Sequence, residues 1–103
     1  MYNTPMIGSG EHAQKLRKDA GKWLKSLREA ANKTQMDVAK DVGYDYYTAV
    51  SQIELGKGRV APDRYEVYAK SMGVDPSWFI INLIKFYDPF AYKLLQPMLK
   101  LPK

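Results

Sequence analysis

The chain has 103 residues, of which 46% are hydrophobic and 26% charged, a composition typical of a single globular domain. It has no cysteine and one histidine, His12, so disulfides, thiolate metal sites, cysteine nucleophiles and a serine–histidine–aspartate triad are excluded. The net charge of +5 favours an anionic partner, and neither a membrane span nor a signal peptide is recognisable. We therefore expect a cytoplasmic, non-enzymatic protein that uses no cofactor.

The first third of the chain is predicted to be an arm followed by one amphipathic helix. Residues 1–10 contain a proline and two glycines without a helical period, and we expect a mobile arm there. From residue 11 to 32, apolar residues recur at spacings of three and four, as on one helix face. They are Leu16, Ala20, Trp23, Leu24, Leu27 and Ala31. Gly21 weakens this pattern, so the well-formed helix spans the segment or begins only there, leaving residues 1–19 as an arm or frayed extension.

Two short helices are predicted next. Thr34 and Asp37 have the spacing of a capping box, which begins a helix that Gly43 ends. Asp45 is placed to cap a third helix, which ends at Gly56. A tight turn therefore joins the second helix to the third.

Three further helices complete an all-α prediction. Pro62 suits the first position of a fourth helix that ends at Gly73. Asp-Pro pairs begin a fifth helix at 75–76 and a short sixth helix at 88–89. Pro97 should end the sixth helix near residue 95 or 96, because proline removes a backbone donor. We divide the chain into the arm, a domain over residues 20–87, and a C-terminal helical extension over residues 88–103.

The third helix has an outer face that differs from an idle surface. At about 100° per residue, Val50 and Ile53 share the inner face, and Tyr46 falls on the same side. The outer side carries Tyr47, Thr48, Ser51, Gln52 and Leu55. Lysine and glutamate would be expected on an idle solvated face, whereas short hydrogen-bonding side chains can bond to base edges in DNA. A merely solvated face is the alternative interpretation.

Several basic or polar residues surround this helix. Gln35 lies in the first turn of the second helix, where free backbone N–H groups also attract a phosphate. Lys57, Arg59 and Arg64 follow the third helix and are candidates for phosphate contacts, with Lys33 and Lys40 as weaker ones. Arg28 and Glu54 lie at helix ends that must pack together, so we expect a structural ion pair between them.

The residues in this order resemble the lambda repressor/Cro-type helix-turn-helix family, also called the XRE family. The matching segments are residues 24–28, 34–35, 38–39, 42–43, 50–54, 56–57 and 69–74. The resemblance implies a five-helix DNA-binding domain over residues 20–87, in which the third helix enters the major groove. It implies that Gln35 binds a phosphate and buttresses the third helix. It also matches Tyr46, Tyr47, Thr48, Ser51 and Gln52 to positions that contact bases or the groove in relatives.

One departure from the family pattern affects these assignments. Between Gly43 and Ser51 the chain has one residue more than the common pattern, so the alternative is that the contacts assigned to Tyr46 and Tyr47 are shifted by one position. In that alternative one of the two tyrosines is a core residue, and the angular argument favours Tyr46 for that role.

The C-terminal helices have more apolar surface than one core needs. We expect a two-fold homodimer built from the fifth and sixth helices, with the sixth helix folding back within one chain as the alternative. The expected interface residues are Trp78, Ile81, Phe86, Phe90 and Leu94.

Together these patterns predict a sequence-specific DNA-binding transcription regulator, most simply a dimeric repressor at a palindromic operator, encoded by a bacterium or phage. The alternative is an antitoxin that also binds its own promoter, with the C-terminal apolar segment contacting a protein partner. A small enzyme has the poorest support, because acidic residues do not converge on any catalytic motif.

Overall fold

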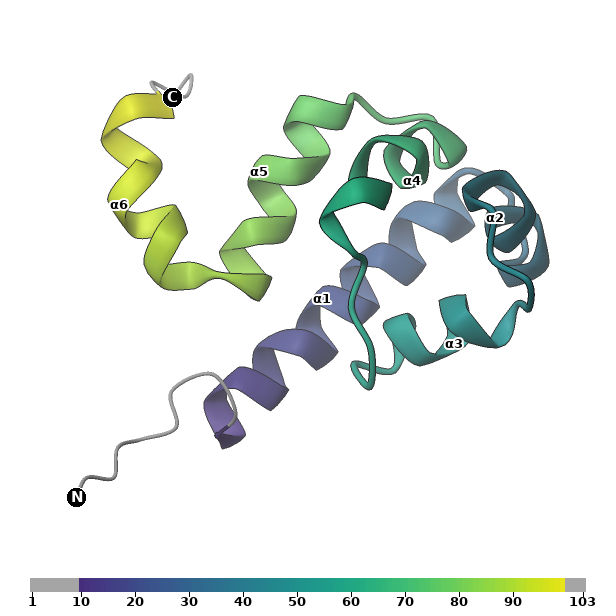
Figure 1. Cartoon of the computed structure of the whole chain (residues 1–103), viewed down its shortest axis with the longest axis horizontal. Helices are drawn as coiled ribbons and strands as arrows, with labels where there is room; N and C mark the ends of the chain where they lie inside the picture. The colour runs from purple at the N-terminus through teal and green to yellow at the C-terminus, as the bar shows by residue number, and fades with distance from the viewer. Residues whose placement is uncertain (1–9, 100–103) are drawn as a thin grey trace.

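The computed structural model describes residues 10–99, and every regular element in that range is helical (Figure 1). In chain order the elements are α1 (Glu11–Ala30), α2 (Gln35–Val42), α3 (Thr48–Glu54), the short 3₁₀ helix η1 (Pro62–Arg64), α4 (Tyr65–Ser71), α5 (Pro76–Tyr87) and α6 (Pro89–Leu99). The predicted all-α class is confirmed. The arm expected over residues 1–10 lies almost entirely outside the described residues.

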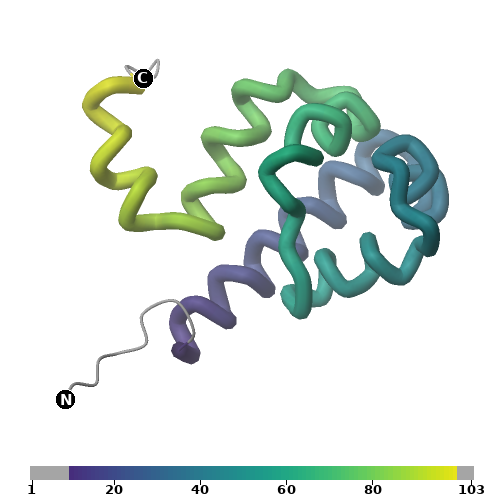
Figure 2. Tube along the Cα trace, in the orientation of Figure 1, coloured from purple at the N-terminus to yellow at the C-terminus, as the bar shows by residue number. Residues whose placement is uncertain are grey.

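The first five helices surround one core. α1 packs against α3 and α5, α2 packs against α3 and α4, and α4 also contacts α5. Side chains from α1 to α5 and from the loop after α3 fill the centre, which holds Ala20, Leu24, Val38, Ala39, Val42, Val50, Ile53, Val60, Tyr68, Ala69, Met72, Phe79 and Leu83. The Cα trace shows α2, α3 and α4 gathered around one end of α1, and α6 lies outside this group beside α5 (Figure 2).

Local sequence signals explain most of the helix ends. The Thr34 hydroxyl accepts a hydrogen bond from the backbone N–H of Asp37, whose carboxylate accepts one from the backbone N–H of Thr34. This is the predicted capping box, and it satisfies two backbone donors at the start of α2. Gly43 ends α2 in the left-handed conformation with φ of 91°, and Asp75 caps α5 by accepting a bond from the Trp78 N–H.

The structure corrects the start of α3. The helix begins at Thr48 rather than near Asp45, and no side chain caps it. Tyr46 is 75% exposed, so the expectation that it is the core tyrosine is wrong. The angular argument extended a regular helix back to Tyr46, whereas the regular helix begins only at Thr48. Tyr44 instead packs against the core.

Two other helix boundaries also differ from expectation. α6 continues through Pro97 to Leu99 instead of ending near residue 95. Pro97 has no N–H to donate to the carbonyl of Lys93, four residues earlier. Lys93 is exposed, so water can bond to that carbonyl instead and the helix can continue. α1 runs without a break from Glu11, so the alternative that a well-formed helix begins at Gly21 is wrong. None of the helices between residues 10 and 99 is long and apolar enough to cross a membrane.

Gly21 has a packing role in α1. A Cβ atom built on Gly21 would lie 2.1 Å from the carbonyl oxygen of Glu54 and 2.9 Å from that of Ile53. The glycine therefore lets α1 cross the end of α3 with the two backbones in contact. Further along the crossing, a Cβ on Gly56 would lie 2.9 Å from the Cα of Lys18, and the φ of Gly56 is 81°.

We predict that Gly21→Ala destabilises the protein by about 1–3 kcal/mol, because the added methyl group forces the two backbones apart. Helix propensity alone predicts the opposite sign, a gain of roughly 1 kcal/mol. Urea unfolding followed by circular dichroism measures the difference. Lys22→Ala, at the exposed neighbouring position, is the control and should change stability little; a Gly21→Ala protein more stable than the wild type would contradict the close approach.

Candidate nucleic-acid interface

The outer face of α3 is polar and accessible. Thr48 and Gln52 are exposed and Ser51 is half-buried, whereas Val50 and Ile53 on the opposite face are buried in the core. Tyr46 and Tyr47 are exposed at the start of the helix. All five candidate base-contacting side chains are thus exposed or half-buried, on α3 or in the turn directly before it, and none of them is charged.

The turn between α2 and α3 is held by backbone hydrogen bonds. The N–H groups of Gly43 and Tyr44 both donate to the carbonyl of Ala39, at 3.0 and 2.9 Å. Ala39 is buried, and its small side chain lets α2 and α3 approach each other. These hydrogen bonds fix the end of α2, from which the turn to α3 begins.

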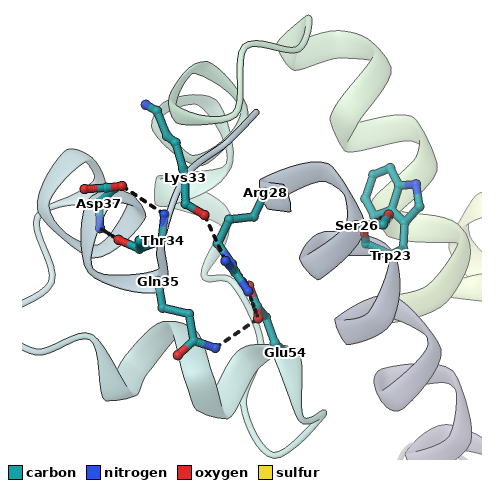
Figure 3. Close-up of polar contacts among 8 residues, drawn as sticks. All are labelled: Trp23, Ser26, Arg28, Lys33, Thr34, Gln35, Asp37 and Glu54. Carbon is teal, nitrogen blue, oxygen red and sulfur yellow. Dashed lines mark hydrogen bonds and ion pairs between the residues drawn. The ribbon is translucent and has the colours of Figure 1, made fainter. Parts of the chain in front are cut away.

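The predicted ion pair between Arg28 and Glu54 is present and buried (Figure 3). Arg28 Nε donates to Glu54 Oε2 at 2.7 Å and Nη2 donates to Oε1 at 3.0 Å, a bidentate pair. Arg28 Nη1 also donates to the Lys33 carbonyl at 2.9 Å. The hydrogen bonds to Glu54 raise the pKa of the Arg28 guanidinium above its usual value. The pair joins the end of α1, the loop before α2 and the end of α3.

Gln35 belongs to the same network. Its side-chain nitrogen Nε2 donates to Glu54 Oε1 at 3.0 Å, so Gln35 supports the end of α3 from the first turn of α2 (Figure 3). The neighbouring Asp37 carboxylate lies at the same helix start, and its hydrogen bonds with Thr34 lower its pKa. This negative charge occupies part of the helix start where a phosphate contact was expected, which leaves the first two backbone N–H groups of α2 for an anion.

The basic residues after α3 have different surroundings. Lys57 is exposed in the loop. The Arg59 guanidinium lies 4.4 Å from the centre of the Tyr87 ring, and Tyr87 Oη accepts a hydrogen bond from the Val60 N–H at 3.1 Å. Burial raises the pKa of the Tyr87 hydroxyl, and the Val60 hydrogen bond opposes this. Tyr87 therefore anchors the loop, a role that its place in the apolar pattern of the fifth helix did not reveal.

Arg64 has a structural role that the sequence did not predict. Its Nη1 donates to the Val42 carbonyl at 2.8 Å, and its guanidinium lies 4.8 Å from the centre of the Tyr44 ring. The side chain is half-buried at the end of α2, where a cation also interacts favourably with the helix dipole. Of the weaker candidates, Lys33 forms an ion pair with Asp41 at 2.6 Å, whereas Lys40 is exposed.

The expected interface residues divide into two groups. Trp78 and Phe86 contact the Trp23 ring at centroid distances of 5.8 and 5.9 Å, so part of their apolar surface is covered within the chain. Phe90 and Leu94 on α6 are 60% and 79% exposed. Ile81 is half-buried. Within residues 10–99, no side chain of α6 is fully buried.

Two helices joined by a tight turn, the second with an accessible polar face, define a helix-turn-helix unit. The helix-turn-helix family model HTH_3 matches residues 24–79, more than half of the chain, and the chain belongs to this family. Its members are DNA-binding transcription regulators, so the predicted fold class and the predicted resemblance to the lambda repressor-type helix-turn-helix family are confirmed. Neither the curated proteins nor the solved structures contain a significant match to the chain.

We predict that Arg28→Met lowers the free energy of unfolding by about 3–5 kcal/mol, because it leaves the Glu54 carboxylate buried without its partner. Replacing both residues, as Arg28→Met with Glu54→Leu, should cost less than the sum of the two single changes, since the double variant buries no unpaired charge. Chemical denaturation of the four proteins measures the coupling. Additive single and double changes would show that the pair makes no specific contribution.

Proposed function

We propose that the protein is a sequence-specific DNA-binding repressor that binds a palindromic operator as a homodimer, with α3 in the major groove. The observation that carries the proposal is the outer face of α3, where Thr48, Ser51 and Gln52 are accessible on a helix whose other face is fixed in the core. A regulator of this kind acts in the cytoplasm, in a bacterial or phage setting.

The side chains on this face suit base recognition. Gln52 can form two hydrogen bonds with adenine, and the hydroxyls of Thr48 and Ser51 can donate to or accept from any base. The exposed rings of Tyr46 and Tyr47 lie beside them, where the hydroxyl groups can reach the groove edge or a phosphate. The rigid support from Arg28, Gln35 and Glu54 favours one fixed docking geometry.

Phosphate contacts would fix the register of α3 on the duplex. Lys57 and Arg59 are both exposed in the loop after α3, and the Arg59 guanidinium lies over the Tyr87 ring. Gln35 and the adjacent α2 backbone are candidates on the other side of α3. Arg64 is the weakest of the set, because one of its donors already caps α2.

The homodimer rests on the apolar surface of α5 and α6. Phe90 and Leu94 are exposed on α6, which packs mainly against α5. On α5, the proposed interface continues through Trp78, Ile81 and Phe86. A second copy would cover this surface and place two α3 helices on half-sites about 34–36 Å apart, or a multiple of that. Occupying a promoter in this way excludes polymerase, which is the simplest route to repression.

An antitoxin is the second candidate, and the exposure of α6 is what favours it. The same apolar surface, with Phe90, Leu94 and Met98 exposed, would then bind a toxin rather than a second copy of the chain. If a toxin encoded beside this gene copurifies with the protein in a fixed ratio, the antitoxin function is favoured over the homodimeric repressor.

Selection of bound duplexes from a random pool tests the function directly. We expect one enriched motif with two-fold symmetry. A pool that shows no enrichment after several rounds would rule out sequence-specific binding.

On the selected duplex, Gln52→Ala and Thr48→Ala should each relax the preference at particular base pairs by about 1–3 kcal/mol. Lys57→Ala is the matched control, because a lost phosphate contact weakens all sequences alike and reduces the salt slope by about 0.9. Fluorescence anisotropy with a panel of single-substitution duplexes measures both effects. Equal losses on all duplexes for Gln52→Ala and Thr48→Ala would count against base reading by α3.

For the interface, Leu94→Glu should shift the protein from dimer to monomer in sedimentation equilibrium and weaken binding to the palindromic duplex more than to a half-site. The change should leave the monomer fold intact, because Leu94 is mostly exposed. Gln96→Glu, an exposed position on the same helix, adds the same charge and is the control. If both variants keep the wild-type mass and affinity, α6 is not the dimer contact.

A further inference from the structure

Three lysines of α1 lie along one side of that helix, next to α3. Lys18, Lys22 and Lys25 are separated by four and three residues, so they fall within about 60° of each other around the helix axis. All three are exposed. They form a basic ridge about 10 Å long, since each helical residue advances the axis by about 1.5 Å.

The position of this ridge relative to α3 is fixed by backbone contact. The crossing described above puts Gly21 of α1 against the carbonyl of Glu54, and Lys18 against Gly56 just after α3 ends. Neither contact depends on a flexible side chain. The ridge is therefore held beside the C-terminal half of the proposed recognition helix.

An open groove of about 420 Å³ separates the lysines from α3. Its walls are formed by Lys18, Lys22 and Lys25 on one side and by Gln35, Ser51 and Leu55 on the other. Ser51 and Gln35 are two of the residues proposed to contact DNA. The ridge thus borders the same groove as two residues of the candidate interface, on the side formed by α1.

The charge of this groove is positive. Glu54 also borders it, but its carboxylate is paired with Arg28 and accepts a further bond from Gln35, and the residue is only 8% exposed. In the part of the chain that the structure describes, no carboxylate lies within ion-pair distance of Lys18, Lys22 or Lys25. Three ammonium groups on an open surface, without an apolar enclosure, match a row of phosphates better than a small ligand.

We propose that the lysine ridge of α1 binds the phosphate backbone of the same duplex that α3 reads, which extends the DNA contact beyond the helix-turn-helix unit. This inference rests on the proposed function. Lys18 and Lys22 lie outside the residues that the family model matches, so family membership does not assign them a role. The ridge of about 10 Å is long enough to contact more than one phosphate of a DNA strand.

The test compares two double variants of equal charge. Lys18→Gln with Lys22→Gln removes two ridge charges, and Lys70→Gln with Lys85→Gln removes two charges from α4 and α5, which do not line the groove. Binding of the full chain to the selected duplex, and to a shuffled duplex of equal length, is measured by anisotropy over a range of salt concentrations. The midpoint of thermal unfolding is measured for both variants, to check that each is as stable as the wild type.

We expect the ridge variant to reduce the slope of log affinity against log salt by about 1.8, which is 0.9 for each lost phosphate contact. Its preference for the selected over the shuffled duplex should not change, because phosphate contacts carry no sequence information. The control should keep the wild-type slope. Equal slopes in the two variants would overturn the ridge, since the lysines would then act only through net charge.

The same data separate failure of the ridge from failure of the proposed function. A wild-type protein that prefers the selected duplex, together with equal slopes in the two variants, refutes the ridge alone. A wild-type protein that binds both duplexes equally refutes sequence-specific repression. In that case, a lower slope of log affinity against log salt in the ridge variant still supports phosphate binding by the ridge. A wild-type protein that binds neither duplex refutes both.

Discussion

The buried contact between Arg28 and Glu54 is the interaction on which the arrangement of this surface depends. It is bidentate, it has little exposure to water, and its partners come from the ends of α1 and α3. Gln35 brings the start of α2 into the same network. Because a bidentate pair requires a particular geometry, and breaking it leaves a buried charge unpaired, the network ties the end of α3 to the end of α1 and the start of α2.

Close backbone packing complements this polar network. Glycine at position 21 lets α1 lie directly against the carbonyl groups that end α3, and the Arg28–Glu54 pair then forms two helical turns further along α1. The same crossing brings Lys18, Lys22 and Lys25 beside the polar face of α3. One helix thus packs against α3 and also carries the three lysines beside it.

The sequence predicted those features that local signals determine. The capping box at Thr34, the αL glycine at position 43 and the Asp-Pro start of α5 each act within one turn, so their residue types are sufficient. The packing of Tyr44 rather than Tyr46 against the core was missed, because it depends on the conformation of the turn between α2 and α3. The roles of Gly21, Arg64 and Tyr87 were missed for another reason: each is defined by a partner more than 20 residues away, which periodicity does not register.

The anchoring of the loop after α3 by Tyr87 bears on how the protein can be divided. The family-matched segment ends at residue 79, but the Val60 N–H and the Arg59 guanidinium both depend on a ring eight positions beyond that limit. A fragment cut at residue 79 would lose the hydroxyl that accepts the Val60 bond and the aromatic face beneath Arg59. The smallest piece of this chain with an intact loop therefore extends to the last residue of α5, and grafting the motif into another scaffold requires carrying that helix with it.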